Sequence, residues 1–313
     1  MDRIFVVIPS FQEEDLEKTV ESIFKNASDP NRIFVGICNQ RSDESDFETF
    51  HCYGDHVRVI ELRSPRPLGL GLAYYSASKL LQGEEFFLRI DAHTRMKKDW
   101  DSTLLACFGR IEEEEKLSKI IISQLTGGFY KIDMGKENFI KADDEDIWLH
   151  ETEPPNSDKW INELIRQLKK YIFNTEHLEN NHYIWSDEDR LREYKEVHMI
   201  SGSFHFSRSQ FLLDCMPDPR VFFWGEEHIL ALRAWTHGYR IFSMNVNSQF
   251  TGGKPQEYLH GVGVNDWRNF NSVVDDNLKE SSTWSILSGL ELGFYGAKDK
   301  ESYDAYMEKI SFN

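Results

Sequence analysis

Two groups of side chains in this sequence could do acid, base or metal chemistry. The first is Asp91 and His93, which lie two residues apart where the apolar run 86–90 ends. At the end of a buried strand this spacing points both side chains the same way, and both are ligands that a divalent cation such as Mg²⁺ or Mn²⁺ accepts. Such a cation could hold a diphosphate. An alternative is that Asp91 only ends the strand.

The second group is the pair Glu226-Glu227, which follows the aromatic run 221–224 where a helix is expected to begin. Carboxylates in a first helical turn are stabilised by the positive end of the helix. Either acid could act as a general base or bind hydroxyl groups. Adjacent residues in a first turn point differently, so we expect one of them at a reacting centre. The alternative is that both only cap the helix.

The elements that must position these groups alternate between strand and helix. Continuous apolar runs predict buried strands, and one-sided apolar spacing predicts helices. The strands are expected at 4–8, 32–38, 57–62, 86–90, 119–125, 198–206 and 239–244, and the helices at about 16–24, 72–81, 100–108, 207–216 and 229–235. This alternation predicts an α/β fold with a mainly parallel, Rossmann-like central sheet and flanking helices.

Ligands of such sheets bind beyond the carboxyl ends of the strands. Pro9 and Ser10 end the first strand, and the polar group Asn39-Gln40-Arg41-Ser42 follows the second. We expect these residues to share one crevice with the residues after Ile90. The turn at Gly69 lacks the third glycine of a dinucleotide-binding fingerprint.

The alternation stops between about 129 and 197, where acids outnumber bases but a helical apolar stripe is present at 160–172. We expect a single domain, 1–313, with an acidic, partly helical insertion at about 129–197 and a C-terminal extension at about 246–313. The insertion could take part in substrate choice, or it could serve only for packing.

Composition limits the possible partners and location. The net charge of −17 disfavours, without excluding, a nucleic-acid partner. The four cysteines have no metal or disulfide spacing, and no run approaches the roughly 20 apolar residues that span a bilayer. We expect a cytoplasmic protein without a membrane partner.

Four blocks, taken in order, resemble a known family: the polypeptide-hydroxyproline N-acetylglucosaminyltransferases, whose cytosolic eukaryotic members modify the ubiquitin-ligase adaptor Skp1. The blocks cover about 1 to 245, interrupted by the insertion. They are Val35–Gln40, Leu88–Arg95 with Trp100-Asp101, Ser201–Arg208, and Phe223–Glu227 with Trp235–Tyr239.

The resemblance implies a GT-A glycosyltransferase fold, a UDP-sugar donor with UDP-N-acetylglucosamine as the first candidate, Mn²⁺ or Mg²⁺, and transfer with retention. It implies that Asp91 and His93 hold the metal and that Glu226 and Glu227 are the acceptor-side and sugar-side acids. The residues that we assign to the nucleotide are Pro9, Ser10, Gln40, Arg41, Gly69, Asp91 and Arg95.

Two positions depart from the family pattern. Tyr74 stands where the family tends to have an arginine, so a contact to the diphosphate or base is lost or replaced. A histidine that the family supplies after its last core strand is absent, and His260 is the nearest one. His260 could be the third metal ligand on a flexible glycine-flanked loop, or it could belong to an ordinary surface turn.

The acceptor is expected to carry a hydroxyl group, on a protein side chain, a glycan or a small molecule. A hydroxylated nucleobase is also open, although the net acidity argues against it. Two other kinds of protein fit the same residues. One is a sugar-nucleotide or carbohydrate-binding module that has kept the GT-A fold while losing turnover. The other is a nucleotidyltransferase, which would need a nucleoside triphosphate.

Overall fold

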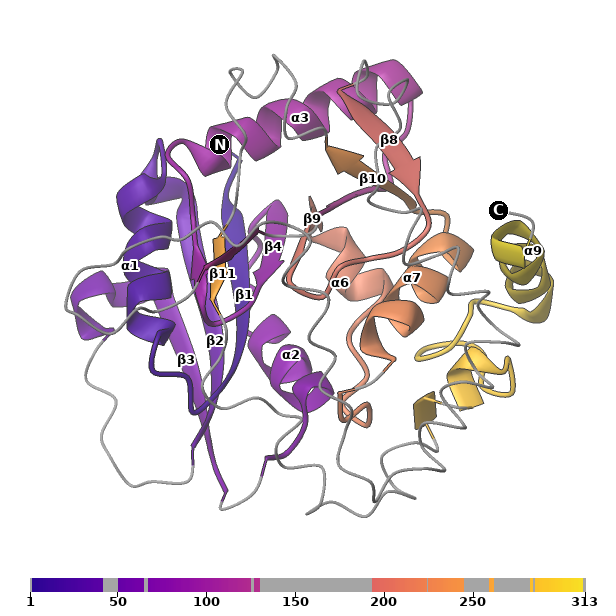
Figure 1. Ribbon diagram of the computed structural model, residues 1–313, viewed down its shortest axis with the longest axis horizontal. Coiled ribbons are helices and arrows are strands. Elements are labelled where there is room, and N and C mark those ends of the chain that lie inside the picture. Colours follow the sequence, from indigo (N-terminus) through magenta and orange to yellow (C-terminus); the bar gives the residue numbers. More distant parts are fainter. Residues whose placement is uncertain are drawn as a thin grey trace.

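The computed structural model describes residues 2–41, 50–64, 67–124, 127–129, 193–223, 225–244, 259–261, 282–283 and 285–311. Within these ranges an eight-stranded sheet forms the centre of the molecule, in the order β3-β2-β1-β4-β9-β6-β10-β8 (Figure 1). A second, three-stranded sheet has the order β5-β11-β7. The predicted insertion helix at 160–172 lies outside the described residues.

The strands are β1 (Ile4–Phe11), β2 (Ile33–Arg41), β3 (Val57–Arg63), β4 (Phe86–Ile90), β5 (Thr94–Arg95), β6 (Ile120–Ser123), β7 (Gly127–Phe129), β8 (Tyr194–Val197), β9 (Phe204–Arg208), β10 (Arg240–Met244) and β11 (Leu259–Gly261). The α-helices are α1 (Leu16–Asn26), α2 (Leu70–Ser78), α3 (Trp100–Glu115), α6 (Gln210–Asp214), α7 (Glu226–Thr236) and α9 (Lys300–Ser311). Two short 3₁₀ segments are η1 (Pro30–Arg32) and η2 (His51–His56).

The pairing directions confirm a mainly parallel sheet with two reversed strands. Strand β1 pairs parallel with β2 and β4, β2 with β3, and β6 with β10. Strand β9 lies antiparallel between β4 and β6, and β8 is antiparallel to β10. The parallel strands β1, β2, β4 and β6 therefore all end at one edge of the sheet.

The two faces of the sheet are covered by different helices because strand side chains alternate between faces. Ile4, Val6 and Ile8 belong to the core under α1 and α3. Phe5 and Val7 belong to the core under α2, α6 and α7, which Figure 1 shows together on one side. Residues 285–311, which fall in the predicted C-terminal extension, add a third core that packs α9 against α7.

Several element boundaries differ from the sequence prediction, and two of the differences lie at the edge where the parallel strands end. Strand β1 was expected to stop at Pro9 but continues to Phe11. Pairing with β4 has ended at Val7, so β1 is paired on one side only at Pro9, a position that tolerates the missing N–H group. The strand expected at 198–206 begins only at Phe204, because residues 202 and 203 form a turn.

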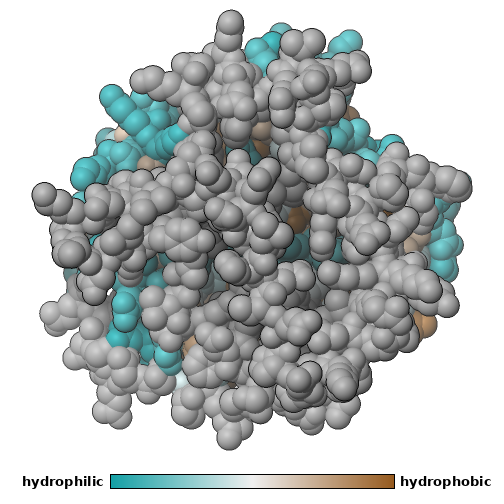
Figure 2. Space-filling view, viewed as in Figure 1, coloured by the Kyte–Doolittle hydropathy of each residue, from teal (hydrophilic) through white to brown (hydrophobic). Residues whose placement is uncertain are grey.

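The surface of the described residues is largely hydrophilic on the face viewed in Figure 2. The large apolar side chains that are exposed among these residues are Leu68, Leu213, Leu290, Leu292 and Phe294. No helix of the described part is both long and apolar enough to cross a membrane.

The N-terminus of α2 is anchored to the loop that precedes α7. The Leu70 and Gly71 N–H groups donate to the carbonyls of Phe222 and Val221, at 2.5 and 3.0 Å. These bonds satisfy two of the N–H groups that a helix start leaves without partners. A Cβ at Gly71 would lie 2.3 Å from the backbone oxygens of Asp218 and Val221, so this contact requires glycine.

Gly71→Ala is expected to lower the free energy of unfolding by about 1–3 kcal/mol, because the new methyl group displaces backbone atoms. Gly109→Ala is the matched control, since a Cβ there has no neighbour within 4 Å inside α3. It should leave stability unchanged or raise it by about 0.4–1 kcal/mol. Urea unfolding of the two variants measures both effects. Equal stabilities of Gly71→Ala and the wild type would contradict the anchoring.

Candidate active site

The carboxyl edge of the sheet carries buried oxygen atoms without hydrogen-bond partners. Ser10 and Asn39 are paired in register on β1 and β2, and both are at most 3% exposed. In the described part of the chain, Ser10 Oγ and Asn39 Oδ1 have no partner. Buried polar atoms are normally hydrogen-bonded. A ligand with N–H or O–H groups would satisfy this pair.

Gln124 continues this row beyond β6. Its backbone N–H donates to the carbonyl of Phe204, and Phe204 is paired with Ile90 on the other side. Gln124 therefore lies two strands from the end of β4. Its side chain is 5% exposed and its Oε1 has no partner among the described residues.

Gln40 and Gly69, both predicted to bind the nucleotide, contact each other. Gln40 Nε2 donates to the Gly69 carbonyl at 3.0 Å, and Gln40 Oε1 accepts from the Leu68 N–H at 2.6 Å. Gly69 has φ 105° and packs against Phe222. The structure thus gives both residues internal contacts, and their role toward a nucleotide stays a prediction. Pro9 is buried on β1, and Arg41 is the last residue of β2.

Asp91 and His93 each have a charged partner. Arg89 Nη1 lies 2.8 Å from Asp91 Oδ1, and the Arg89 side chain is only 2% exposed. His93 Nδ1 lies 3.0 Å from Glu13 Oε2. Burial opposes protonation of His93, but the Glu13 hydrogen bond and the nearby acids outweigh it and raise the pKa of the imidazole.

The donor types of this corner fit a divalent cation. A carboxylate that binds Nδ1 of a histidine is a common support for a metal-ligating imidazole, and Nε2 is then the nitrogen that a metal would use. No group of three His, Cys, Asp or Glu side chains suited to a metal forms within the described residues. The backbone of β11, however, pairs residue 260 with Thr94, the residue after His93. His260 as the third ligand therefore stays a prediction that the strand register supports.

Arg95, predicted to assist the diphosphate, is 9% exposed and forms an ion pair with Asp15 at 2.6 Å. Its guanidinium is therefore held by the acidic segment between β1 and α1. A direct contact to phosphate remains a prediction.

Glu226 and Glu227 begin α7 and have different environments, as expected for adjacent residues in a first turn. Glu227 is exposed and its carboxylate accepts a short hydrogen bond from the Gly202 N–H. Glu226 is 5% exposed, and its Oε1 has no partner in the described part. Burial raises the pKa of Glu226 to about 7; the charge of Arg89 opposes the shift, while Glu227 and Asp91 add to it.

Sequence reasoning missed two residues near these acids, Arg89 and His205. Arg89 is a buried cation within the apolar strand β4, and its position in an otherwise apolar run was a signal. Asn39 was expected in the same crevice as Gln40, although it was not among the residues assigned to the nucleotide. His205 is fully buried on β9 and contacts Tyr74. No pattern of neighbouring residues in the sequence predicts this contact.

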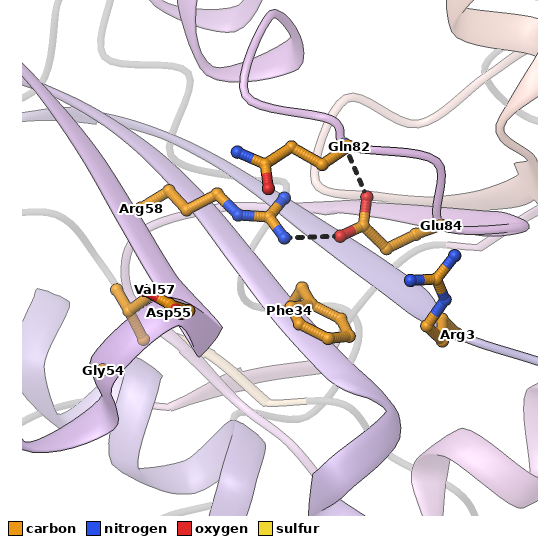
Figure 3. Close-up of a pocket in the computed structure, with 8 residues that line it drawn as sticks. All are labelled: Arg3, Phe34, Gly54, Asp55, Val57, Arg58, Gln82 and Glu84. Carbon is orange, nitrogen blue, oxygen red and sulfur yellow. Dashed lines mark hydrogen bonds and ion pairs between the residues drawn. The ribbon is translucent and has the colours of Figure 1, made fainter.

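A hollow of ≈ 310 Å³ lies at the opposite, amino edge of the sheet (Figure 3). Three of its charged side chains are engaged with the protein: Arg58 forms a 2.6 Å ion pair with Glu84, and Arg3 donates to the Gly83 carbonyl. The residues at the carboxyl edge are therefore the better candidates for chemistry.

Comparisons with known proteins show the family and the fold of this chain. The model of a family described as "Glycosyltransferase (GlcNAc)" matches residues 3–52 and 44–251. No curated protein matches the chain.

Two solved structures share the fold at 13% identity. One is GalNAc-T7 with UDP, GalNAc and Mn²⁺, with a TM-score of 0.54 over 98% of this chain and 50% of that chain. The other is TarS 1–349 of S. aureus in complex with UDP-GlcNAc, with a TM-score of 0.53 over 99% of this chain and 71% of that chain. This chain thus spans half the length of the GalNAc-T7 chain. The likeness confirms the expected GT-A fold.

Proposed function

Because the chain belongs to the Glycosyltransferase (GlcNAc) family, we propose that it transfers N-acetylglucosamine from UDP-N-acetylglucosamine to a hydroxyl acceptor. The proposal includes retention at the anomeric carbon and a requirement for Mn²⁺ or Mg²⁺. A protein hydroxyproline is the first acceptor class to test, followed by glycans and small molecules. The expected cytoplasmic location is also part of the proposal.

The row of buried oxygens at the carboxyl edge is the observation that supports this function best. Ser10, Asn39, Gln124 and Glu226 each have a buried oxygen without a partner in the described part of the chain. A sugar nucleotide carries N–H and O–H groups on its base, its ribose and its sugar, and it can satisfy acceptors that are spread along several strand ends. The two neighbouring structures contain UDP with GalNAc and Mn²⁺, and UDP-GlcNAc.

The proposed roles follow the order of the strands. Ser10 and Asn39, at the ends of β1 and β2, would bind the nucleotide, and Asp91 follows β4. Asp91 and His93, with His260, would hold the cation, which when bound supplies positive charge to the leaving diphosphate. Arg95 would remain a phosphate contact if its pair with Asp15 opens.

The two acids of α7 would act on the sugar and acceptor side. A carboxyl whose pKa is about 7 can accept or donate a proton near neutral pH, so Glu226 is the better candidate for contact with the reacting hydroxyl. Glu227 would act through the turn that it holds at Gly202, while its exposed part contacts the acceptor.

Purified protein with Mn²⁺ is expected to release UDP from UDP-N-acetylglucosamine, and faster when a hydroxyproline peptide is present. Excess EDTA should abolish the release, and added Mn²⁺ should restore it. Proton NMR of the first product gives the anomeric configuration. UDP-glucose and UDP-N-acetylgalactosamine serve as comparison donors.

Other outcomes would identify the alternatives. Calorimetric binding of UDP without turnover of any donor would favour a sugar-nucleotide-binding module. Turnover of a nucleoside triphosphate alone would favour a nucleotidyltransferase. Full activity in EDTA would exclude the metal requirement while leaving sugar transfer in place.

A further inference from the structure

Tyr74 and His205 form a buried contact to which the proposed mechanism gives no role. Both residues are 0% exposed, and the Tyr74 hydroxyl lies 2.8 Å from His205 Nε2. On the other side of the imidazole ring, His205 Nδ1 lies 3.1 Å from the carbonyl oxygen of Ser201. A continuous hydrogen-bonded chain therefore leads from α2 through β9 to residue 201.

The chemistry of the three groups determines which atom donates in each of these hydrogen bonds. The Ser201 carbonyl can only accept, so Nδ1 of His205 donates to it, and Nε2 of a neutral ring then accepts from the Tyr74 hydroxyl. Burial and the nearby Arg89 lower the pKa of His205 to about 3, so the ring is neutral over the range in which enzymes are assayed. Burial likewise raises the pKa of Tyr74, which keeps its hydroxyl a donor.

The turn that follows Ser201 lies beside both acids of α7. The N–H of Gly202 donates to the Glu227 carboxylate. A Cβ at Gly202 would lie 2.7 Å from Glu227 Oε1 and 3.3 Å from Glu226 Oε2, so the backbone passes directly beside both side chains. Movement of this turn would therefore move Glu227 and change the space around Glu226.

Tyr74 also lies beside Arg89, which is on the sugar-nucleotide side of the site. The guanidinium carbon of Arg89 lies 5.8 Å from the centre of the Tyr74 ring, and Arg89 forms the ion pair with Asp91. One buried tyrosine is thus in contact with the residue that holds Asp91 and, through His205, with the turn that holds Glu227.

We propose that Tyr74 and His205 are positioning residues for transfer: their hydrogen bond fixes the Ser201–Ser203 turn and thereby the acids Glu226 and Glu227. The inference rests on the proposed function for its catalytic consequence. Its geometric part, that the Tyr74 hydroxyl holds the turn, can be measured without any substrate.

The test compares Tyr74→Phe with Tyr239→Phe. Tyr239 is 2% exposed in the same core, and its hydroxyl donates to Asp214 at 3.0 Å, away from the acids. Both variants lose one hydroxyl and one hydrogen bond, so a general loss of stability affects both. Three quantities are measured: hydrogen exchange of the Gly202 amide, kcat and KM for UDP-N-acetylglucosamine, and the Kd of UDP.

Tyr74→Phe is expected to speed exchange of the Gly202 amide by about tenfold or more. It should also lower kcat by about 10- to 100-fold, the effect expected of a misplaced catalytic group, with KM for the donor and Kd for UDP unchanged. Tyr239→Phe should change none of these quantities. His205→Gln, whose amide can still donate to Ser201 and accept from Tyr74, should be milder than His205→Leu.

Two results would overturn the proposal. Unchanged exchange of the Gly202 amide in Tyr74→Phe would show that the hydroxyl does not hold the turn. Faster exchange with an unchanged kcat would show that the turn does not position the acids for transfer. If Tyr74→Phe does not fold, the same comparison is made between His205→Gln and His205→Leu. Failure of the proposed function is seen separately, as absence of turnover in the wild type, and the exchange measurement still decides the geometric part.

Discussion

Glu226→Gln is expected to reduce kcat by at least about 100-fold and, at the same time, to stabilise the metal-free protein above pH 7. The loss of activity follows from the role proposed for a carboxyl that is 5% exposed and has an oxygen without a partner in the described part. The gain in stability follows from burial. An ionised carboxylate in this place lacks water, and the amide of glutamine has no charge to bury.

The pH dependence has a definite sign. Burial raises the pKa of Glu226 from its usual 4.5 to about 7, so the folded state binds this proton more tightly than the unfolded state. The contribution of the Glu226 carboxyl to the stability of the folded state is fully present below about pH 4.5. It is lost as the pH rises through about 7. This difference between the folded and unfolded pKa of Glu226 corresponds to about 3 kcal/mol of unfolding free energy. The figure is an upper bound, because neighbouring groups can rearrange around the charge.

Thermal unfolding in EDTA at pH 5 and pH 8.5 tests this sign. Glu226→Gln should have a higher Tm than the wild type at pH 8.5, and the difference should shrink at pH 5. Glu112→Gln, which alters a partly exposed ion pair with Arg208, should show no such pH-dependent gain. A variant that is less stable than the wild type at both pH values, or that keeps full activity, would contradict the environment and role given to Glu226.

Such a combination of higher stability and lower activity is expected where function requires a destabilised group. Asp91, Glu226 and Glu227 are three acids near one buried cation, Arg89, which influences the ionisation of Glu226 and Glu227. The excess negative charge opposes folding in the absence of a cation. The same excess would favour binding of a divalent ion.

The sequence predicted the elements better than it predicted their contacts. Strand β4 begins and ends where its apolar run does, and α7 begins at the paired acids that follow the aromatic run 221–224. These features could be predicted because buried strands and helix starts are determined by residues close together in the sequence.

The partners of the site residues were not predictable because they depend on strand order and direction. Glu13 meets His93 across 80 residues, and Tyr74 meets His205 across 131. The second contact exists because β9 runs antiparallel beside β4, and an apolar run carries no sign of its direction. Gln40 was assigned to a ligand because it follows a strand, yet its amide is used by the Leu68–Gly69 backbone.

Asp91→Asn is expected to reduce kcat by about 1,000-fold and to remove the stabilisation that Mn²⁺ gives the protein, because a neutral amide is a poor ligand for a hard cation. In the wild type, a cation at 100 times its Kd should stabilise the folded state by about 2.7 kcal/mol. Asp214→Asn is the matched control. It also loses an ion pair, with Lys119, but lies away from the carboxyl edge, so activity and the Mn²⁺ effect should be retained.

The two carboxylate substitutions should also differ in their effect on the metal-free protein. Asp91 forms a 2.8 Å ion pair with a buried arginine, so Asp91→Asn should lower stability by about 1–3 kcal/mol at pH 8.5. Glu226 has no such ion pair, so Glu226→Gln should raise stability under the same conditions. Stability changes of opposite sign in the two variants would show that Arg89 neutralises Asp91. They would also show that the Glu226 carboxylate has no neutralising partner in the metal-free protein. If both substitutions destabilise equally, Arg89 is shared between the acids, and the separation of a metal side from an acceptor side at this edge is wrong.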